Sequence, residues 1–87
     1  MKVNDVVTVM TLSGEYVGIL IENNGNNVIL GKPKLVTQGE QGLALADGIS
    51  ATGIVPDAVH FHNVTFATLA HNDVVTAHNV AISEDDA

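Results

Sequence analysis

An Asn-Gly turn between two apolar runs is the feature that most constrains this chain. From residue 7 to residue 30, β-branched and aliphatic residues are interrupted first at Ser13-Gly14 and then at Asn23-Asn24-Gly25-Asn26. Asn-Gly in this setting is the strongest short-range signal of a β-hairpin, because both residues accept the positive φ that a tight turn requires. The stretch therefore predicts three short strands joined by two turns.

Side-chain alternation gives each predicted strand a face. In the first strand, residues 6–12, Val7 and Val9 share one face. In the second, residues 15–22, Gly18 stands in mid-strand, where a glycine indicates a sharp bend or a close backbone approach. The third strand starts at Asn27, and one continuation of it lies at residues 35–37. Pro33 precedes this continuation and belongs at an edge or a bulge, because it cannot donate to a ladder.

The second half of the chain predicts two further strands. Glycines and Pro56-Asp57 break up residues 38–57, within which residues 41–46 suit either a strand extension, which we favour, or a helical turn. Residues 58–69 are rich in β formers and predict one long strand. A turn at residues 71–73 leads to a last strand at 74–76 with a continuation at 80–82. No helix is expected.

Five predicted strands and no predicted helix favour an all-β fold: a small five-stranded, strongly bent antiparallel sheet or SH3-like open barrel. With 87 residues the chain makes one domain, at residues 1–83, and residues 84–87 are expected to form an acidic disordered tail. A domain this small is marginal as a monomer, and without cysteine it has no disulfide. Oligomerisation is the remaining common source of stability.

The charge and hydropathy of the chain limit which partners and which cellular location we expect. The formal net charge is -7, with three lysines and no arginine, which argues against strong nucleic-acid binding. No apolar run approaches the roughly 20 residues of a membrane span. The polar residues Asn4-Asp5 follow Met1-Lys2-Val3, so the core of a signal peptide is lacking and a cytoplasmic location is expected.

The spacing of the first three strands resembles the first motif of the Sm-like family, which includes the Sm, LSm and Hfq proteins. The matching residues are Val7, Val9, Gly14, Gly18, Leu20, Asn27 and Leu30. The family's second motif would fall around residues 69–77, with Leu69-Ala70-His71 in place of its Ile-Arg-Gly. The resemblance implies a Sm-like barrel without catalytic activity.

The resemblance also implies assembly and a binding site. Sm-like subunits form rings by pairing the fourth strand of one copy with the fifth strand of the next, so we expect a homo-oligomeric ring of roughly five to seven copies. The interface residues would be Val64, Phe66, Thr68, Val74 and Val75. Single-stranded RNA would be held by Asn24, Asn26 and Asn27, with His71 stacking on a base and Lys32 and Lys34 near phosphate.

Other sites are weaker. His60 and His62 share one strand face, as in some zinc or copper sites, but a third ligand is lacking, so two solvated or interfacial histidines are the favoured interpretation. His71-Asn72-Asp73 is ordinary turn composition, and neither a nucleophile elbow nor a phosphate loop is visible. No cofactor or metal is expected.

Two hypotheses remain open for the task of the ring. It binds RNA, or acts on RNA through partners; alternatively, it is a structural or scaffolding oligomer that has lost the RNA pocket. A peptide-binding SH3-like module is disfavoured, because the three aromatic residues are too few to line such a groove.

Overall fold

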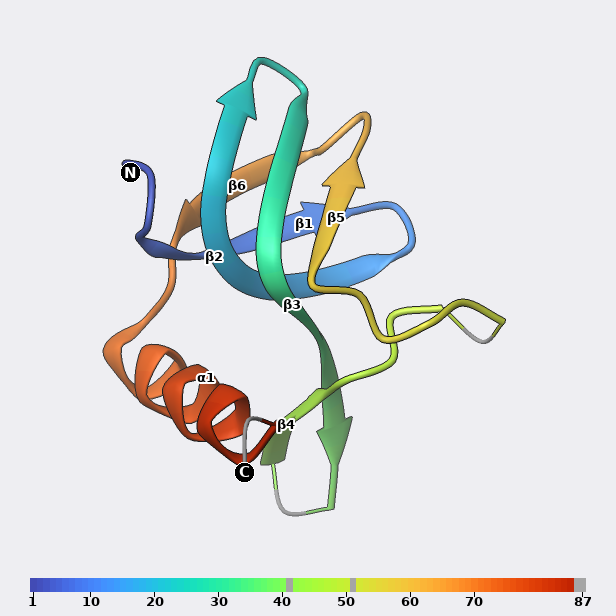
Figure 1. The fold of residues 1–87 in the computed structure, drawn as a ribbon, viewed down its shortest axis with the longest axis vertical. Coiled ribbons are helices and arrows are strands. Elements are labelled where there is room, and N and C mark those ends of the chain that lie inside the picture. Colours follow the sequence, from blue (N-terminus) through green and yellow to red (C-terminus); the bar gives the residue numbers. More distant parts are fainter. Residues whose placement is uncertain (41, 51, 86–87) are drawn as a thin grey trace.

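The computed structural model describes residues 1–40, 42–50 and 52–85, which form an antiparallel sheet of six strands followed by one helix (Figure 1). The elements are β1 (Val6–Thr11), β2 (Gly14–Asn24), β3 (Asn27–Gly39), β4 (Gly42–Ala46), β5 (Ala58–Phe61), β6 (Phe66–Leu69) and α1 (Asn72–Asp85). The prediction of a mostly antiparallel β domain is confirmed. The prediction of no helix is wrong.

The first three strands form the meander that the sequence predicts. β1 pairs with β2, and β2 pairs with β3. At the second turn Asn24 pairs with Asn27, and Gly25 takes a φ of 64° between them. A positive φ is the conformation for which an Asn-Gly turn is suited. The hairpin prediction is therefore confirmed at the residues that carried it.

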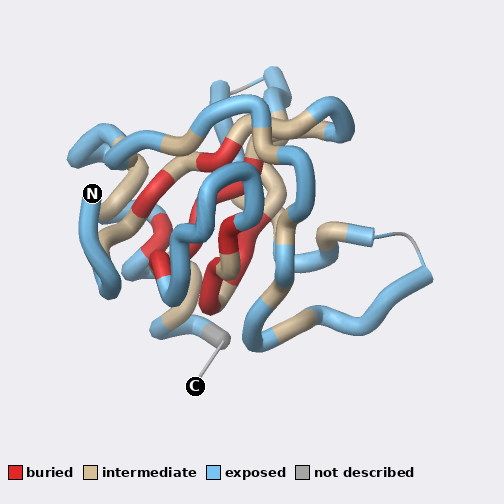
Figure 2. Tube along the Cα trace, turned by 90° about the horizontal axis from the view of Figure 1, so that it is seen from above, coloured by how far each residue is buried: buried red, intermediate tan, exposed pale blue. Residues whose placement is uncertain are grey.

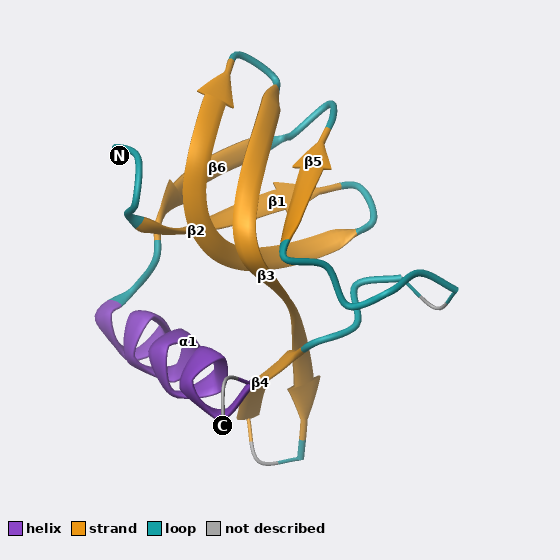
Figure 3. Cartoon of the chain, viewed as in Figure 1, coloured by secondary structure: helices purple, strands orange, loops and turns teal. Residues whose placement is uncertain are grey.

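Gly18 marks the bend of β2, as expected. The pairing of β2 with β3 shifts register between Val17 and Ile19, which is a bulge. A Cβ placed on Gly18 would lie 2.9 Å from the carbonyl oxygen of Gly31, closer than any side chain can approach. The lack of a side chain lets the two backbones approach where β2 curves, a curve that is plain in Figure 3.

β3 has three partners. Its first half pairs with β2 on one side and with β5 on the other, through Val28 to Gly31. Its second half, Leu35 to Gly39, pairs with β4 and extends as a hairpin beside the helix (Figure 1). Pro33 lies between the two halves, at the irregular stretch of the β2–β3 ladder, which confirms its predicted place at a bulge. The strand extension near residues 41–46 is also confirmed, with Gln41 outside the described residues.

The single long strand predicted for residues 58–69 is wrong. β5 ends at Phe61, β6 begins at Phe66, and Asn63 turns the chain with a φ of 58°. Asparagine is one of the few residues that adopt this left-handed conformation readily. Two backbone hydrogen bonds fix the turn: the amide of Val64 donates to Asn26 O, and that of Thr65 donates to Met10 O.

The last strand predicted at residues 74–76 and 80–82 is helix α1 instead. The more buried side chains recur at positions 74, 75, 78, 81 and 82, which is helical spacing. His71 caps the helix, because its Nδ1 accepts a hydrogen bond from the amide of Asp73 at 3.2 Å. The helix includes Glu84 and Asp85, which we had assigned to a disordered tail; Asp86 and Ala87 lie outside the described residues.

The core is small and lies inside the bent sheet (Figure 2). It contains the inward faces of the first three strands, including Val7 and Val9, which are fully buried and share one face, as predicted. Tyr16 packs against Phe61 of β5 with ring centroids 4.7 Å apart. The buried hydrophobic residues that form it are Val7, Val9, Tyr16, Leu20, Val28 and Leu30. The core thus joins β5 to the meander across the inside of the sheet.

Candidate functional site

Amide side chains gather at one end of the sheet, where two turns meet. The β2–β3 turn presents Asn24, Asn26 and Asn27, all exposed. The β5–β6 turn lies against it, held by the hydrogen bond from the amide of Val64 to Asn26 O at 2.8 Å. This second turn exposes His62 and Asn63, which our prediction did not include. Asn63, a residue favoured in turns, was the available signal.

His71 is absent from this surface. β6 leads away from the paired turns, and Ala70 at its far end donates a backbone hydrogen bond to Val6 O. His71 follows there and caps α1. The structure therefore does not place His71 with the asparagines at the paired turns, and its stacking on a base stays a prediction.

The two lysines expected near phosphate both contact carboxylates. Lys32 Nζ lies 3.1 Å from Asp57 Oδ1, and both side chains are substantially exposed. Lys34 is buried, with 2% of its side chain exposed, and its Nζ lies 2.5 Å from Asp47 Oδ1. A lysine that already neutralises a carboxylate offers little net positive charge to a phosphate.

Three strands, β4, β5 and β6, have a single strand partner in the described part of the chain, so each leaves one edge without a neighbouring strand. β5 pairs there with β3 alone and β6 with β1 alone. Of the predicted interface residues, Phe66 and Thr68 lie on β6 and are exposed, and Val64 lies in the preceding turn, packed against the core. Val74 and Val75 lie on α1 instead, so they have no strand edge to offer.

His60 and His62 both point away from the core, since both are exposed and Phe61 between them is half-buried. Across residues 1–40, 42–50 and 52–85, no group of three or more His, Asp or Glu side chains is placed to hold a metal ion. The pair therefore gains no third ligand from the described side chains of its own chain.

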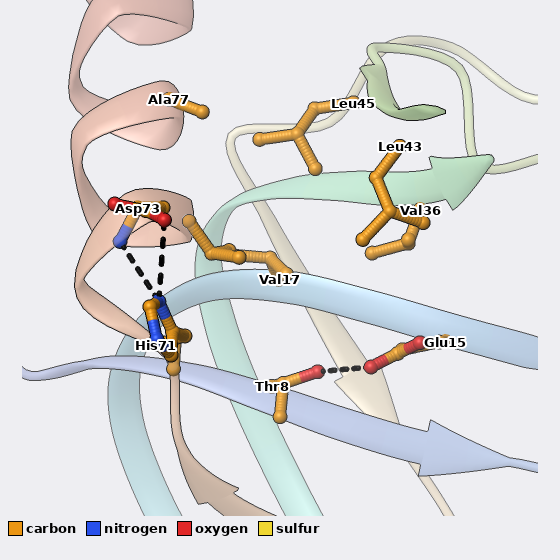
Figure 4. A pocket seen from close by; sticks show the side chains of 11 residues that line it. Thr8, Glu15, Val17, Val36, Leu43, Leu45, His71, Asp73 and Ala77 are labelled. Atoms are coloured by element: carbon orange, nitrogen blue, oxygen red, sulfur yellow. Dashed lines mark hydrogen bonds and ion pairs between the residues drawn. The ribbon is translucent and has the colours of Figure 1, made fainter. Parts of the chain in front are cut away.

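A hollow of about 380 Å³ separates α1 from the sheet (Figure 4). β1, β2, β3 and β4 form one wall, and residues 70–77 form the other. His71 and Val74, two residues singled out for other roles, line it. The sequence did not predict this hollow, because it depends on the helix that was taken for a strand.

Comparison with protein-family models, with curated proteins and with solved structures finds no match to this chain. In the part of the chain that the structure describes, no helix combines the length and the apolar character needed to cross a membrane.

Proposed function

We propose that this chain is a divergent Sm-like subunit that assembles with copies of itself into a closed ring of roughly five to seven subunits. The strand order supports the proposal. If β4 is an extension of the β3 hairpin, the remaining strands follow the order β5-β3-β2-β1-β6. The fourth and fifth strands of that set, β5 and β6, then stand at the two ends of the sheet, where Sm-like rings join their subunits.

The single observation that carries the proposal is the pair of open edges on β5 and β6. An exposed strand edge is a template for pairing with another chain, and a head-to-tail interface that closes into a ring removes it. Phe66 and Leu69 on β6 are 51% and 55% exposed, so apolar side chains lie beside the backbone groups. Pairing of β5 with a neighbour's β6 would satisfy both edges at once.

Within the ring, a structural or scaffolding role is better supported than RNA binding. Lys32 and Lys34 each contact a carboxylate, and the chain carries a net charge of -7. Counter-ion release from phosphates, the main source of nucleic-acid affinity, needs cationic side chains facing the ligand. A non-catalytic scaffold makes no such demand.

RNA binding stays as a second candidate because the two turns meet. Asn24, Asn26 and Asn27 are exposed beside His62 and Asn63. Amide groups read the edges of unpaired bases, and an imidazole can stack on them. Single-stranded RNA is therefore the nucleic acid that such a surface would suit.

Size-exclusion chromatography with light scattering tests the ring. A discrete mass of about five to seven subunits of 9.1 kDa supports it, and a stable monomer at micromolar concentration contradicts it. Titration of labelled oligouridylate at low salt then separates the two roles, because electrostatic attraction is strongest there. Binding that falls in N27A but not in N79A, where Asn79 is an exposed asparagine on α1, would favour RNA. If oligouridylate does not bind, the scaffolding role is favoured.

A further inference from the structure

The hollow under α1 has the size of a small-molecule site. Its volume is about 380 Å³, and pockets that hold small ligands span about 300–1,000 Å³. A second depression of about 330 Å³ shares Leu43, Leu45 and Ala77 with it and continues along the helix. The two together give an elongated space between the helix and the β3–β4 hairpin.

Most of the wall is apolar. The strands contribute Val17, Val36, Leu43 and Leu45, and the helix contributes Val74 and Ala77. Leu43 is 66% exposed, so the hollow leaves much of this side chain in contact with water. An aliphatic ligand chain lying there would remove apolar surface from water, which is favourable at roughly 25 cal/mol per Å².

The polar lining groups include the carboxylates of Glu15 and Asp73 in the hollow and of Glu84 in the second depression. Figure 4 shows His71 and Asp73 on the helix side, below Ala77, and Thr8 with Glu15 on the strand side. Thr8 Oγ1 donates to Glu15 Oε2 at 2.9 Å, which fixes this half-buried carboxylate in the wall. Asp73 stands beside His71, with 3.8 Å between Oδ2 and Nδ1. Neither lysine nor arginine is among the described lining residues.

We propose that this hollow binds a small amphiphilic amine. The ammonium group lies beside Glu15, which Thr8 holds in the wall, and the aliphatic chain runs along the apolar wall between α1 and β4. A carboxylate of the same length would meet a like charge there. None of the described lining residues lies on β5 or β6, so the site does not depend on ring assembly.

Charge also argues against a second copy of this chain as the occupant. Ile54-Val55 is an exposed apolar loop segment that such a copy could offer, at 83% and 61% exposure. Asp57 follows two residues later and is itself exposed. A second copy, with its formal net charge of -7, would bring further negative charge to a hollow lined by two carboxylates, whereas an ammonium group brings the opposite charge.

The test is an NMR titration of the full chain with hexylammonium chloride, with sodium hexanoate and methylammonium chloride as matched probes. Hexylammonium is expected to shift the amide signals of Val17, Val36, Leu45 and Val74 with a saturable dependence. The affinity for hexanoate should be lower by a factor of about ten or more, since a hydrogen bond to a charged group contributes about that factor to binding. The proposal would be overturned if neither hexylammonium nor methylammonium gave saturable shifts, or if hexanoate bound as tightly as hexylammonium.

Two variants locate the ligand. E15Q should weaken hexylammonium binding by about three- to tenfold and leave hexanol binding unchanged, because only the charge is lost. A77L should abolish binding of both by filling the space, and leucine is a good helix former, so α1 is retained. E22Q, which alters an exposed carboxylate of β2 outside the hollow, is the control. Unchanged binding in both E15Q and A77L would place the ligand elsewhere and defeat the proposal.

Discussion

The imidazole Nε2 of His78 donates a hydrogen bond to the backbone carbonyl oxygen of Lys32 at 2.8 Å, across 46 positions of sequence. His78 is fully buried although it lies on a helix that is otherwise largely exposed. Lys32 has a φ of 49°, and its own amide donates to Asp57 O. The backbone of Lys32 in β3 thus links two other parts of the chain. Its carbonyl oxygen accepts a hydrogen bond from α1, and its amide donates one to the segment before β5.

Replacing His78 should release α1 from the sheet. H78A removes a buried side chain and leaves the Lys32 carbonyl without this donor, so we expect the free energy of unfolding to fall by about 2–4 kcal/mol. H78Q keeps an amide donor near the same place and should recover part of the loss. Urea denaturation measures both. Stability equal to that of N79A, an exposed neighbour, would show that the helix is held in another way.

Gly18 should tolerate no side chain. In G18A the new methyl group would meet Gly31 O at 2.9 Å and Leu30 Cβ at 3.1 Å, so strands β2 and β3 must separate. We expect a loss of about 1–3 kcal/mol in thermal or urea unfolding. G48A is the matched control, because a Cβ there has no neighbour within 4 Å among the described residues. Equal stability of the two variants would rule out a steric role for Gly18.

The two lysine–aspartate pairs should respond differently to loss of the carboxylate. D47N removes the carboxylate charge that faces Lys34, whose side chain is 2% exposed, and should lower the free energy of unfolding by about 1–2 kcal/mol. D57N acts on an exposed pair and should cost at most about 0.5 kcal/mol. Denaturation at low and at high salt measures both, and only the second effect should be largely screened by salt. A larger effect of D57N would reverse the assignment of the buried pair.

A charge on the β6 edge should block assembly. F66K places an ammonium group on an exposed side chain of this strand, a device that natural edge strands use against pairing. We expect the oligomer mass seen by light scattering to shift toward monomer while the fold is retained. L12K, in the β1–β2 turn where Leu12 is 100% exposed, should leave the mass unchanged. An oligomer that survives F66K would have another interface.

Local signals made the first half of the fold predictable. The Asn24–Asn27 turn, the alternation of Val7 and Val9 and the bend at Gly18 each depend on neighbours in sequence, and the structure has all three. Such features follow from backbone sterics and strand periodicity. The β4 extension was open to two interpretations, because five residues are too few to establish a period.

The second half was less predictable because its high β propensity favoured strands where the structure has a helix and a turn. Val74-Val75-Thr76 is β-branched and suited a strand, but the segment is a helix that buries His78 and hydrogen-bonds it to Lys32 O of β3. Packing in the folded chain overrides propensity in this way. Asn63 hid a turn in a run of β formers. The predicted grouping of His71 with the asparagines was affected in the same way, because His71 caps the misassigned helix.

The register of β6 has a consequence for the order in which the molecule is made. Val7 of β1 pairs with Leu69 of β6, whereas β1, β2 and β3 pair only with their immediate successors until β5 is added. During synthesis from the N-terminus, the meander can form early, but one side of β1 waits unpaired until residue 69 has left the ribosome. The nascent chain therefore carries an open β1 edge until β6 has emerged, and β6 then covers it.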